Sequence, residues 1–208
     1  MKLIDESFAG LIDRFASRDP SPGGGSAAAA TGALAVALGR MVCELTLGRP
    51  KYAEVQDEVA AIAGRLTQRT ESLRLLVDED ADAYARVAAA AALPKETADQ
   101  RAAREKALFE ANRDATMAPL KTISECLAAA EDLDRLLRIG NANCRSDAGT
   151  AVALANAALM GAYLNVRANL PRLPDEEFRA RARALVDGAL MKSGDTIREA
   201  FAWLNQNF

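Results

Sequence analysis

The fold is decided by residues 21–47, which read SPGGGSAAAATGALAVALGRMVCELTL. A Pro-Gly-Gly-Gly turn opens directly into a run that is apolar or small-sided on nearly every face of a helix. A helix without a polar face does not lie on a protein surface, so other helices must surround it. Its first turn has unpaired backbone N–H groups and the positive end of the helix dipole. This end of the helix therefore favours an anionic or carbonyl-rich ligand.

The composition favours closely packed helices and excludes several kinds of partner. The 208 residues are 50% hydrophobic but only 5% aromatic, and alanine-rich runs occur throughout the chain. Such a composition suits helices better than a sheet. The formal net charge of −3 gives no electrostatic footprint for nucleic acid or for an anionic membrane. We therefore expect neither nucleic acid nor a membrane as a partner.

The cysteines and histidines restrict the chemistry further. The chain has no histidine, and its three cysteines form no CxxC pair, so we expect no metal site. Three scattered thiols do not make a disulfide framework, which favours a reducing compartment. The first 19 residues carry acidic side chains among apolar ones, unlike a signal peptide. These features together predict a cytoplasmic protein.

A membrane span is the alternative interpretation of residues 27–47. The run is long enough to cross a bilayer, but Arg40 and Glu44 lie inside it, and its residues are mostly Ala and Gly. A buried central helix is the preferred interpretation. A small membrane protein, with solubility that depends on detergent, is the alternative.

Helical periodicity covers most of the remaining chain. The predicted helices outside the central one are 3–16, 51–93, 97–118, 120–139, 148–170 and 175–208. Pro119 is expected to break or kink the chain between two of them, and Gly and Pro residues mark other helix ends. Ser26 is expected to cap the central helix, and Ser146 or Asp147 the helix that follows them. The pattern contains no strand, repeat or linker. The sequence therefore predicts an all-α, single-domain helical bundle over residues 1–208.

Two of the predicted helices, 27–47 and 148–170, lack a proper polar face. One such helix can form the axis of a monomeric bundle. A second one implies a subunit interface that buries the surplus apolar surface. We therefore expect a homo-oligomer, most simply a two-fold homodimer.

Asp80 interrupts an apolar seam. Within residues 51–93, apolar positions recur at alternating steps of three and four and form one face of a helix. This face consists of Val55, Val59, Ile62, Leu66, Thr70, Leu73, Val77, Asp80, Tyr84 and Val87. A carboxyl group on such a face tends to have a raised pKa unless it is paired, which suits a general acid or base near neutral pH. The alternative is a structural Asp80 satisfied by an arginine or a backbone N–H.

Other segments carry groups that suit a ligand. The Gly23–Ser26 turn is not a phosphate-binding P-loop, because no Gly-Lys-Ser/Thr follows it; it either contacts a ligand or lets helices approach closely. The loop at 140–147 is rich in amides that can hydrogen-bond a heterocycle, or it simply caps a helix. Asn165 and Asn169 lie four apart on an apolar helix and need partners. Three cations at helix ends can hold a carboxylate, or are simply solvated: Arg49, Lys51 and Lys95.

Several stretches, taken in order and spacing, resemble one family. They are PGGGSAAAATGALAVALGRMVCELTLGRPKY at 22–52, VDEDADAY at 77–84 with LPK at 93–95, GNANCRSDAG at 140–149 and GAYLNVRANL at 161–170. Together they are similar to the formimidoyltetrahydrofolate cyclodeaminase / methenyltetrahydrofolate cyclohydrolase family. The resemblance extends over nearly the whole chain.

The resemblance implies a fold, a substrate and a set of site residues. It implies an all-helical dimer that binds a tetrahydrofolate, without a permanently bound cofactor, and acts on the carbon between N5 and N10. Asp80 matches the family's catalytic aspartate. The expected substrate-binding residues are Gly23, Gly24, Gly25, Ser26, Arg49, Lys51, Lys95, Asn141, Asn143 and Asp147. Residues 48–51 depart from the run of cations common in the family, which leaves open which cation contacts the glutamate tail.

Two reactions and one non-enzymatic role follow as hypotheses. The preferred reaction forms 5,10-methenyltetrahydrofolate and ammonia from 5-formimidoyltetrahydrofolate, and the segment CRSD favours it. The alternative is hydrolysis of 5,10-methenyltetrahydrofolate to 10-formyltetrahydrofolate. The third hypothesis is a non-enzymatic helical scaffold in which Asp80 is structural and the glycine turn is a packing device.

Overall fold

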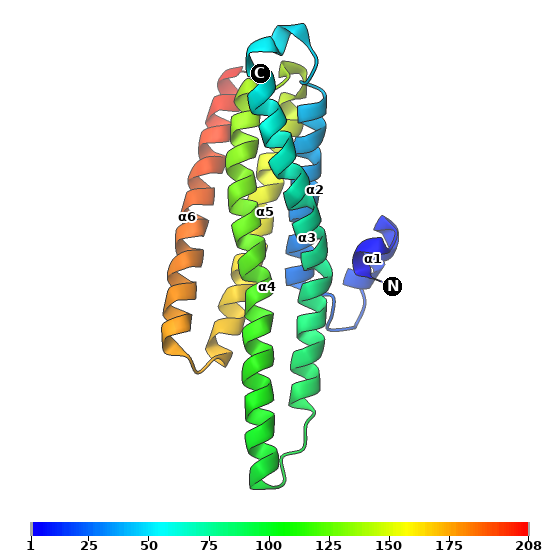
Figure 1. The fold of residues 1–208 in the computed structure, drawn as a ribbon, viewed down its shortest axis with the longest axis vertical. Coiled ribbons are helices and arrows are strands. Elements are labelled where there is room, and N and C mark those ends of the chain that lie inside the picture. The colour runs from blue at the N-terminus through cyan, green and yellow to red at the C-terminus, as the bar shows by residue number, and fades with distance from the viewer. Residues whose placement is uncertain (1, 208) are drawn as a thin grey trace.

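Long helices dominate the architecture (Figure 1). The computed structural model describes residues 2–207, and within them the chain forms six α-helices and four short 3-10 helices, with no strand. The α-helices are α1 (Phe8–Phe15), α2 (Gly24–Glu44), α3 (Gln56–Ala91), α4 (Ala98–Ile139), α5 (Arg145–Asn169) and α6 (Glu176–Asn207). The 3-10 helices are η1 (Leu3–Asp5), η2 (Pro50–Val55), η3 (Ala142–Cys144) and η4 (Leu170–Arg172). The predicted all-α bundle is confirmed.

Helix α2 packs in the bundle against α3, α4 and α5. Its small residues let the helices approach closely. A methyl group added at Gly32 would lie 2.8 Å from the Sγ atom of Cys126, and one added at Gly39 would overlap the side chain of Leu133. The apolar, small-sided run that decides the fold is therefore the surface on which the other helices pack.

Two segments of the described chain are long and apolar enough to cross a membrane. They are Gly24–Glu44 and residues 142–172, with mean hydropathies of 1.5 and 1.3. About half of each window is buried inside the bundle: 50% for the first and 44% for the second. Both therefore serve as core helices in this fold, as the preferred interpretation of the sequence expected.

Several predicted boundaries differ from the structure. Residues 51–55 form η2 and not the start of α3, and α4 continues through Pro119 as one helix. Ser26 does not cap α2, because the helix begins at Gly24 and its N-cap residue is Gly23. The predicted capping by Ser146 or Asp147 is also wrong, since α5 begins at Arg145 and includes both residues.

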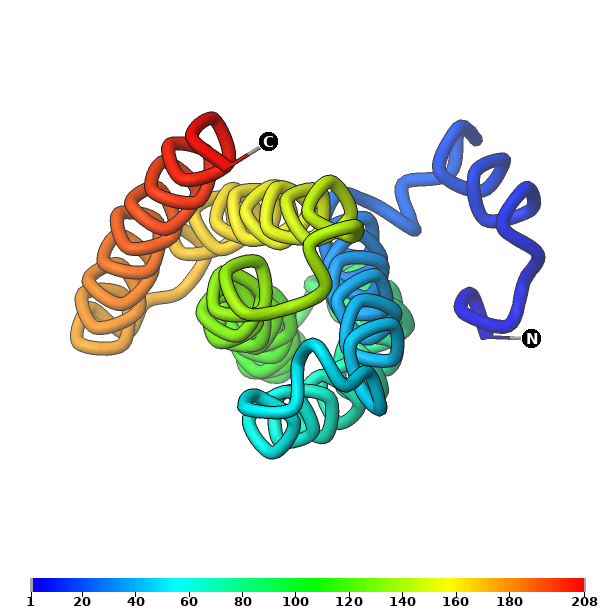
Figure 2. The backbone as a smooth tube through the Cα atoms, turned by 90° about the horizontal axis from the view of Figure 1, so that it is seen from above, coloured from blue at the N-terminus to red at the C-terminus, as the bar shows by residue number. Residues whose placement is uncertain are grey.

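The shape of the molecule leaves two features outside the main bundle. Helices α3 and α4 form a long hairpin that extends past the ends of α5 and α6 (Figure 1). Helix α1 lies beside the bundle, next to α2 (Figure 2). The backbone N–H of Leu3 in η1 donates to Asp78 Oδ1 at 2.6 Å, which ties the N-terminal segment to α3.

Candidate active site

The carboxylate of Asp80 lies against the start of α2. Its Oδ2 atom accepts a hydrogen bond from the backbone N–H of Ser26 at 2.8 Å, and the Ser26 hydroxyl lies 3.1 Å from the same oxygen. Asp80 thus occupies one of the N–H groups that the first turn of α2 leaves free. The Oδ1 atom of Asp80 accepts no hydrogen bond within residues 2–207. One oxygen is therefore held and the other is available.

The glycine turn gives Asp80 the space that it needs. A Cβ atom at Gly25 would overlap the Asp80 carboxylate, so no other residue fits at this position without moving the aspartate. The side chain of Ser26 is fully buried, and its hydroxyl also lies 2.8 Å from the carbonyl oxygen of Val77 on α3. The turn and the aspartate, 54 residues apart in sequence, form one packed unit.

A cavity of about 260 Å³ opens in front of Asp80. It lies between the turn at the start of α2, the last third of α3, Ala115 of α4, the end of α5 and η4. The lining residues are Pro20, Ser21, Gly23, Gly24, Asp80, Tyr84, Val87, Ala115, Asn165, Ala168, Asn169 and Arg172. The apolar seam of α3 is buried from Val59 to Val77 and opens into this cavity at Asp80. The carboxyl group therefore stands where the core ends and the cavity begins.

Two amide side chains on α5 face the same cavity. Pro119 has no N–H, so the carbonyl of Ala115 one turn earlier lacks its helical partner. The Nδ2 atom of Asn169 donates to this carbonyl at 2.9 Å. The Nδ2 atom of Asn165 donates to the Gly161 carbonyl of its own helix at 2.9 Å. Both amides are thereby oriented by backbone groups that hold them in place.

Burial raises the pKa of Asp80 above its ordinary value of 3.8, and the two hydrogen bonds from Ser26 oppose that rise. Desolvation disfavours the charged form, whereas donors to the carboxylate favour it. The direction is the one required of a carboxyl group that exchanges a proton at moderate pH. Asp80 accepts a backbone N–H, as the structural interpretation expected, and it also faces a cavity. Its catalytic role stays a prediction.

The residues predicted from the sequence fall into two groups in a single chain. Gly23 and Gly24 line the Asp80 cavity, and Gly25 and Ser26 contact the carboxylate. The other predicted residues, apart from Lys95, lie beyond the opposite end of α2: Arg49, Lys51, Asn141, Asn143 and Asp147. A helix of 21 residues is about 30 Å long. The expectation that all of them share one pocket is not met within one chain.

Within this second group, Asn141 is held by hydrogen bonds within the fold. Buried Asn141 donates from its backbone N–H to the Thr46 hydroxyl at 2.9 Å and from Nδ2 to the Leu45 carbonyl at 2.8 Å. The Tyr52 hydroxyl accepts the backbone N–H of Ala142 at 2.8 Å. These bonds fasten the α4–α5 connection to the end of α2. In this chain Asn141 has a structural role.

Several cavity residues were not selected as site residues from the sequence, among them Tyr84, Asn165, Asn169 and Arg172. The two asparagines carried a signal, since polar residues four apart on an apolar helix need partners. Tyr84 continued the seam and resembled a core residue. Arg172 lies in η4, and no periodicity relates it to Asp80, so only the tertiary structure brings it to the cavity.

Metal-binding groups are a separate question. The described residues contain no group of three or more His, Cys, Asp and Glu side chains placed to hold a metal ion. The three cysteines are free and buried.

The family of the chain follows from comparison with known proteins. A family model described as formiminotransferase-cyclodeaminase matches residues 7–187. The chain belongs to this family. The family predicted from the sequence motifs is thus confirmed, and members of the formiminotransferase-cyclodeaminase family include both stand-alone chains and longer proteins.

Three relatives illustrate that range. The chain is 36% identical to methenyltetrahydrofolate cyclohydrolase of Methylorubrum extorquens over 91% of each protein. It is 34% identical to formimidoyltransferase-cyclodeaminase of Rattus norvegicus over 92% of this chain, but it spans only 35% of that relative's length. The crystal structure of formiminotetrahydrofolate cyclodeaminase from Thermotoga maritima matches with a TM-score of 0.78 and 27% identity, covering 94% of this chain and 97% of that one.

Proposed function

We propose that this chain is a folate one-carbon enzyme that converts 5-formimidoyltetrahydrofolate into 5,10-methenyltetrahydrofolate and ammonia. The observation that carries the proposal is Asp80: a half-buried carboxyl group with a raised pKa, one oxygen held by Ser26 and the other free at a cavity. The cyclodeaminase from Thermotoga maritima, which shares the fold, supports this reaction.

The chemistry assigns two proton transfers to Asp80. N10 attacks the formimidoyl carbon on N5, a C–N10 bond forms, and Asp80 accepts the proton that N10 loses. The tetrahedral carbon then carries N5, N10 and an amino group. Asp80 returns the proton to that amino group, its C–N bond breaks, and ammonia leaves with the methenyl bridge in place. The proposal requires no metal or bound cofactor, because the amidinium-like carbon is already electrophilic.

The amides and the glycine turn suit the rest of the substrate. The faces of Gly23 and Gly24 carry no side chains, so a flat pterin can lie against the backbone there. The Asn165 and Asn169 amides can pair with the amide-like edge of the pterin ring. A site with buried polar groups that are partly unpaired binds a ligand more tightly when the ligand supplies the missing hydrogen-bond partner.

Hydrolysis of 5,10-methenyltetrahydrofolate to 10-formyltetrahydrofolate is the second candidate. The observation that favours it is the 36% identity to a methenyltetrahydrofolate cyclohydrolase over 91% of both chains. Both reactions pass through a tetrahedral carbon bonded to N5 and N10. In hydrolysis Asp80 would accept a proton from the water that attacks the methenyl carbon and deliver it to N5. The C–N5 bond then breaks, and the hydroxyl proton is lost to solvent as the formyl group forms on N10.

The absorption band of the methenyl product distinguishes the two reactions. With 5-formimidoyltetrahydrofolate, a cyclodeaminase produces the band and releases an equal amount of ammonia. With 5,10-methenyltetrahydrofolate, a cyclohydrolase removes the band faster than the spontaneous rate. If neither substrate changes and folate gives no thermal stabilisation, the scaffold hypothesis replaces the enzyme.

We further propose a two-fold homodimer formed through α2 and α5. Their outer faces expose large apolar side chains, including Leu34 at 49%, Met160 at 49% and Leu164 at 65% of their full area. Figure 2 shows α1 and α6 flanking the side of the bundle on which α2 and α5 lie. Apolar patches of this kind are typical of subunit interfaces.

Such a dimer would also reunite the predicted site residues. A two-fold axis perpendicular to the middle of α2 places the end of this helix in one copy beside its start in the other. The segments 49–51 and 141–147 of the second copy would then approach the Asp80 cavity and complete the folate site. Sedimentation as a monomer at micromolar concentration would contradict this arrangement. A cytoplasmic location stays a prediction, supported by the three free, buried cysteines.

A further inference from the structure

Pro119 is an unfavourable residue for its position in α4. The helix continues through it as a single helix of 42 residues, and Pro119 is buried. Proline is the least favourable residue in a helix interior, because it lacks the backbone N–H and its ring crowds the carbonyl four residues earlier. Helix propensity therefore gives no reason for Pro119, and its role lies in its effect on neighbouring groups.

The carbonyl that Pro119 leaves without its helical donor belongs to Ala115. Ala115 lines the Asp80 cavity, and its oxygen accepts a hydrogen bond from Nδ2 of Asn169 on α5 at 2.9 Å. Any other residue at position 119 would bring a backbone N–H to this oxygen. That N–H would draw the carbonyl back along the axis of α4 and weaken its bond to Asn169. Pro119 and Asn169 are therefore linked through one acceptor.

The bond to α4 determines which atom of the Asn169 amide faces the ligand. With Nδ2 bound to Ala115, Oδ1 points the other way, and Nη1 of Arg172 approaches it at 3.4 Å. Within residues 2–207, Arg172 is the donor that Oδ1 has. An amide oxygen accepts two hydrogen bonds. Oδ1 of Asn169 can therefore accept a further bond from a ligand in the cavity.

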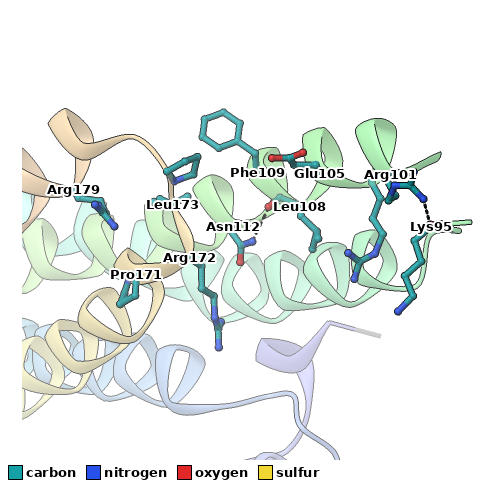
Figure 3. Close-up of a pocket in the computed structure, with 12 residues that line it drawn as sticks. Lys95, Arg101, Glu105, Leu108, Phe109, Asn112, Pro171, Arg172, Leu173 and Arg179 are labelled. Atoms are coloured by element: carbon teal, nitrogen blue, oxygen red, sulfur yellow. Dashed lines mark hydrogen bonds between the residues drawn. The ribbon is translucent and has the colours of Figure 1, made fainter. Parts of the chain in front are cut away.

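Arg172 reaches this position from the connection between α5 and α6. Figure 3 shows its guanidinium group directed away from Leu173 and Arg179, and Arg172 lines the Asp80 cavity. Lys95, predicted from the sequence to bind the substrate, lies in the turn between α3 and α4 instead and does not line this cavity (Figure 3). Of the two cations, Arg172 is the one beside Asn169.

Asn165 provides an internal comparison. It lies one turn before Asn169 on α5 and lines the same cavity. Its Nδ2 atom donates to the carbonyl of Gly161 within its own helix. The orientation of Asn165 therefore does not depend on α4, whereas that of Asn169 depends on the carbonyl that Pro119 frees.

We propose that Pro119 is a positioning residue that acts on the substrate through Asn169. By keeping the Ala115 carbonyl free for Nδ2, it presents Oδ1 of Asn169 as a fixed acceptor for an N–H group of the bound substrate. A donor that meets a fixed acceptor binds with a smaller loss of conformational entropy. The inference rests on the proposed function for the identity of the substrate, whose pterin ring supplies the N–H group.

The first test restores the missing backbone N–H with Pro119→Ala and Pro119→Val. We expect KM for the folate substrate to rise about five- to tenfold in both, the effect of weakening one hydrogen bond. The kcat should stay within about twofold, because neither change reaches Asp80. Valine replaces most of the ring volume, so a parent-like KM in Pro119→Val alone would assign the effect to packing and overturn the inference.

A control separates this effect from a general disturbance of α4. Ile123→Val trims a fully buried side chain one turn further along the helix and leaves every backbone N–H in place. It should keep the KM of the parent, with thermal unfolding recorded for every variant. A rise in KM equal to that of Pro119→Ala would contradict a specific role for Pro119.

A double-mutant cycle tests whether Pro119 acts through Asn169. Asn169→Ala should raise KM, and adding Pro119→Ala to it should change KM no further, because the amide to be positioned is gone. In the matched cycle with Asn165→Ala, the two effects on KM should multiply. Multiplication in the Asn169 cycle as well would overturn the inference.

NMR of the ¹⁵N-labelled protein without ligand gives a readout that is independent of the reaction. The Nδ2 proton signals of Asn169, identified by their loss in Asn169→Ala, should shift and exchange faster with water in Pro119→Ala. Identical signals in the parent and in Pro119→Ala would overturn the inference, whatever the activity. If the signals change but neither folate substrate reacts, the proposed function is wrong and the positioning of Asn169 by Pro119 remains.

Discussion

The two ends of α2 carry polar clusters of opposite character. At the start of the helix, Asp80 accepts from Ser26 with one oxygen and leaves the other free beside a cavity. At the far end, Thr46, Asn141 and Tyr52 bond to one another and to nearby backbone groups. Both clusters join segments that are distant in sequence. Only the first keeps hydrogen-bonding capacity unused.

The difference separates residues that stabilise the fold from residues that can take part in the reaction. A buried polar cluster that satisfies its own donors and acceptors fixes the fold. A cluster that leaves a desolvated carboxylate oxygen unpaired at a cavity can bind a ligand there and transfer a proton to or from it. Substitutions at the start of α2 should therefore change activity more than stability, and those at the far end should do the reverse.

Asp80→Asn should have the largest effect. Removing a group that moves a proton in the transition state lowers kcat by about a thousandfold. The asparagine oxygen can still accept the Ser26 N–H, so the thermal unfolding midpoint should change little. The rate is measured by the methenyl absorption band. An Asp80→Asn protein that is folded and keeps full activity would remove the catalytic assignment.

Gly25→Ala should have the next largest effect. A methyl group at this position overlaps the Asp80 carboxylate and must displace it, so we expect kcat/KM to fall about a hundredfold. Gly64→Ala is the matched control, because nothing lies within 4 Å of its added methyl group on α3. That control should keep its activity and gain about 0.5–1 kcal/mol in the free energy of unfolding. Equal activities of the two variants would contradict the packing argument.

Thr46→Val tests the other end of α2. The Thr46 hydroxyl is buried, donates to the Val42 carbonyl at 2.7 Å and accepts the Asn141 N–H. Removing it leaves a buried N–H unpaired and should cost about 1–3 kcal/mol of unfolding free energy, measured in urea. Thr67→Val, which removes an exposed hydroxyl bonded only within its own helix, should cost less than about 0.5 kcal/mol.

The pH dependence of stability gives the smallest effect. Burial raises the pKa of Asp80 in the folded protein above 3.8, so the folded state holds the proton more tightly than the unfolded state. The stabilisation is complete below pH 3.8 and is lost as the pH rises through the folded pKa. Relative to Asp80→Asn, the parent should therefore become less stable as the pH increases over this range. Ser26 offsets part of this change, and a difference that is constant with pH would exclude the raised pKa.

The sequence predicts the site unevenly, for physical reasons. The recurrence of apolar positions at steps of three and four within residues 51–93 identified Asp80, because helical periodicity determines which residues share a face. The glycine turn was selected because a run of glycines opens a helix whose first N–H groups are free. The structure adds that Gly25 leaves the space that the Asp80 carboxylate occupies. Arg172 and the Pro119–Asn169 relationship were missed, since they depend on where α4, α5 and η4 meet in space. Asn141 was selected for its chemistry, but local pattern does not reveal that Thr46 and Leu45 already occupy its donors.

The most direct measurement is a crystal structure of the protein with an unreactive tetrahydrofolate analogue. The account predicts N10 within about 3.2 Å of an Asp80 carboxylate oxygen, with the pterin against Gly23 and Gly24. A folate bound elsewhere, with no contact between the N5–N10 region and Asp80, would contradict it.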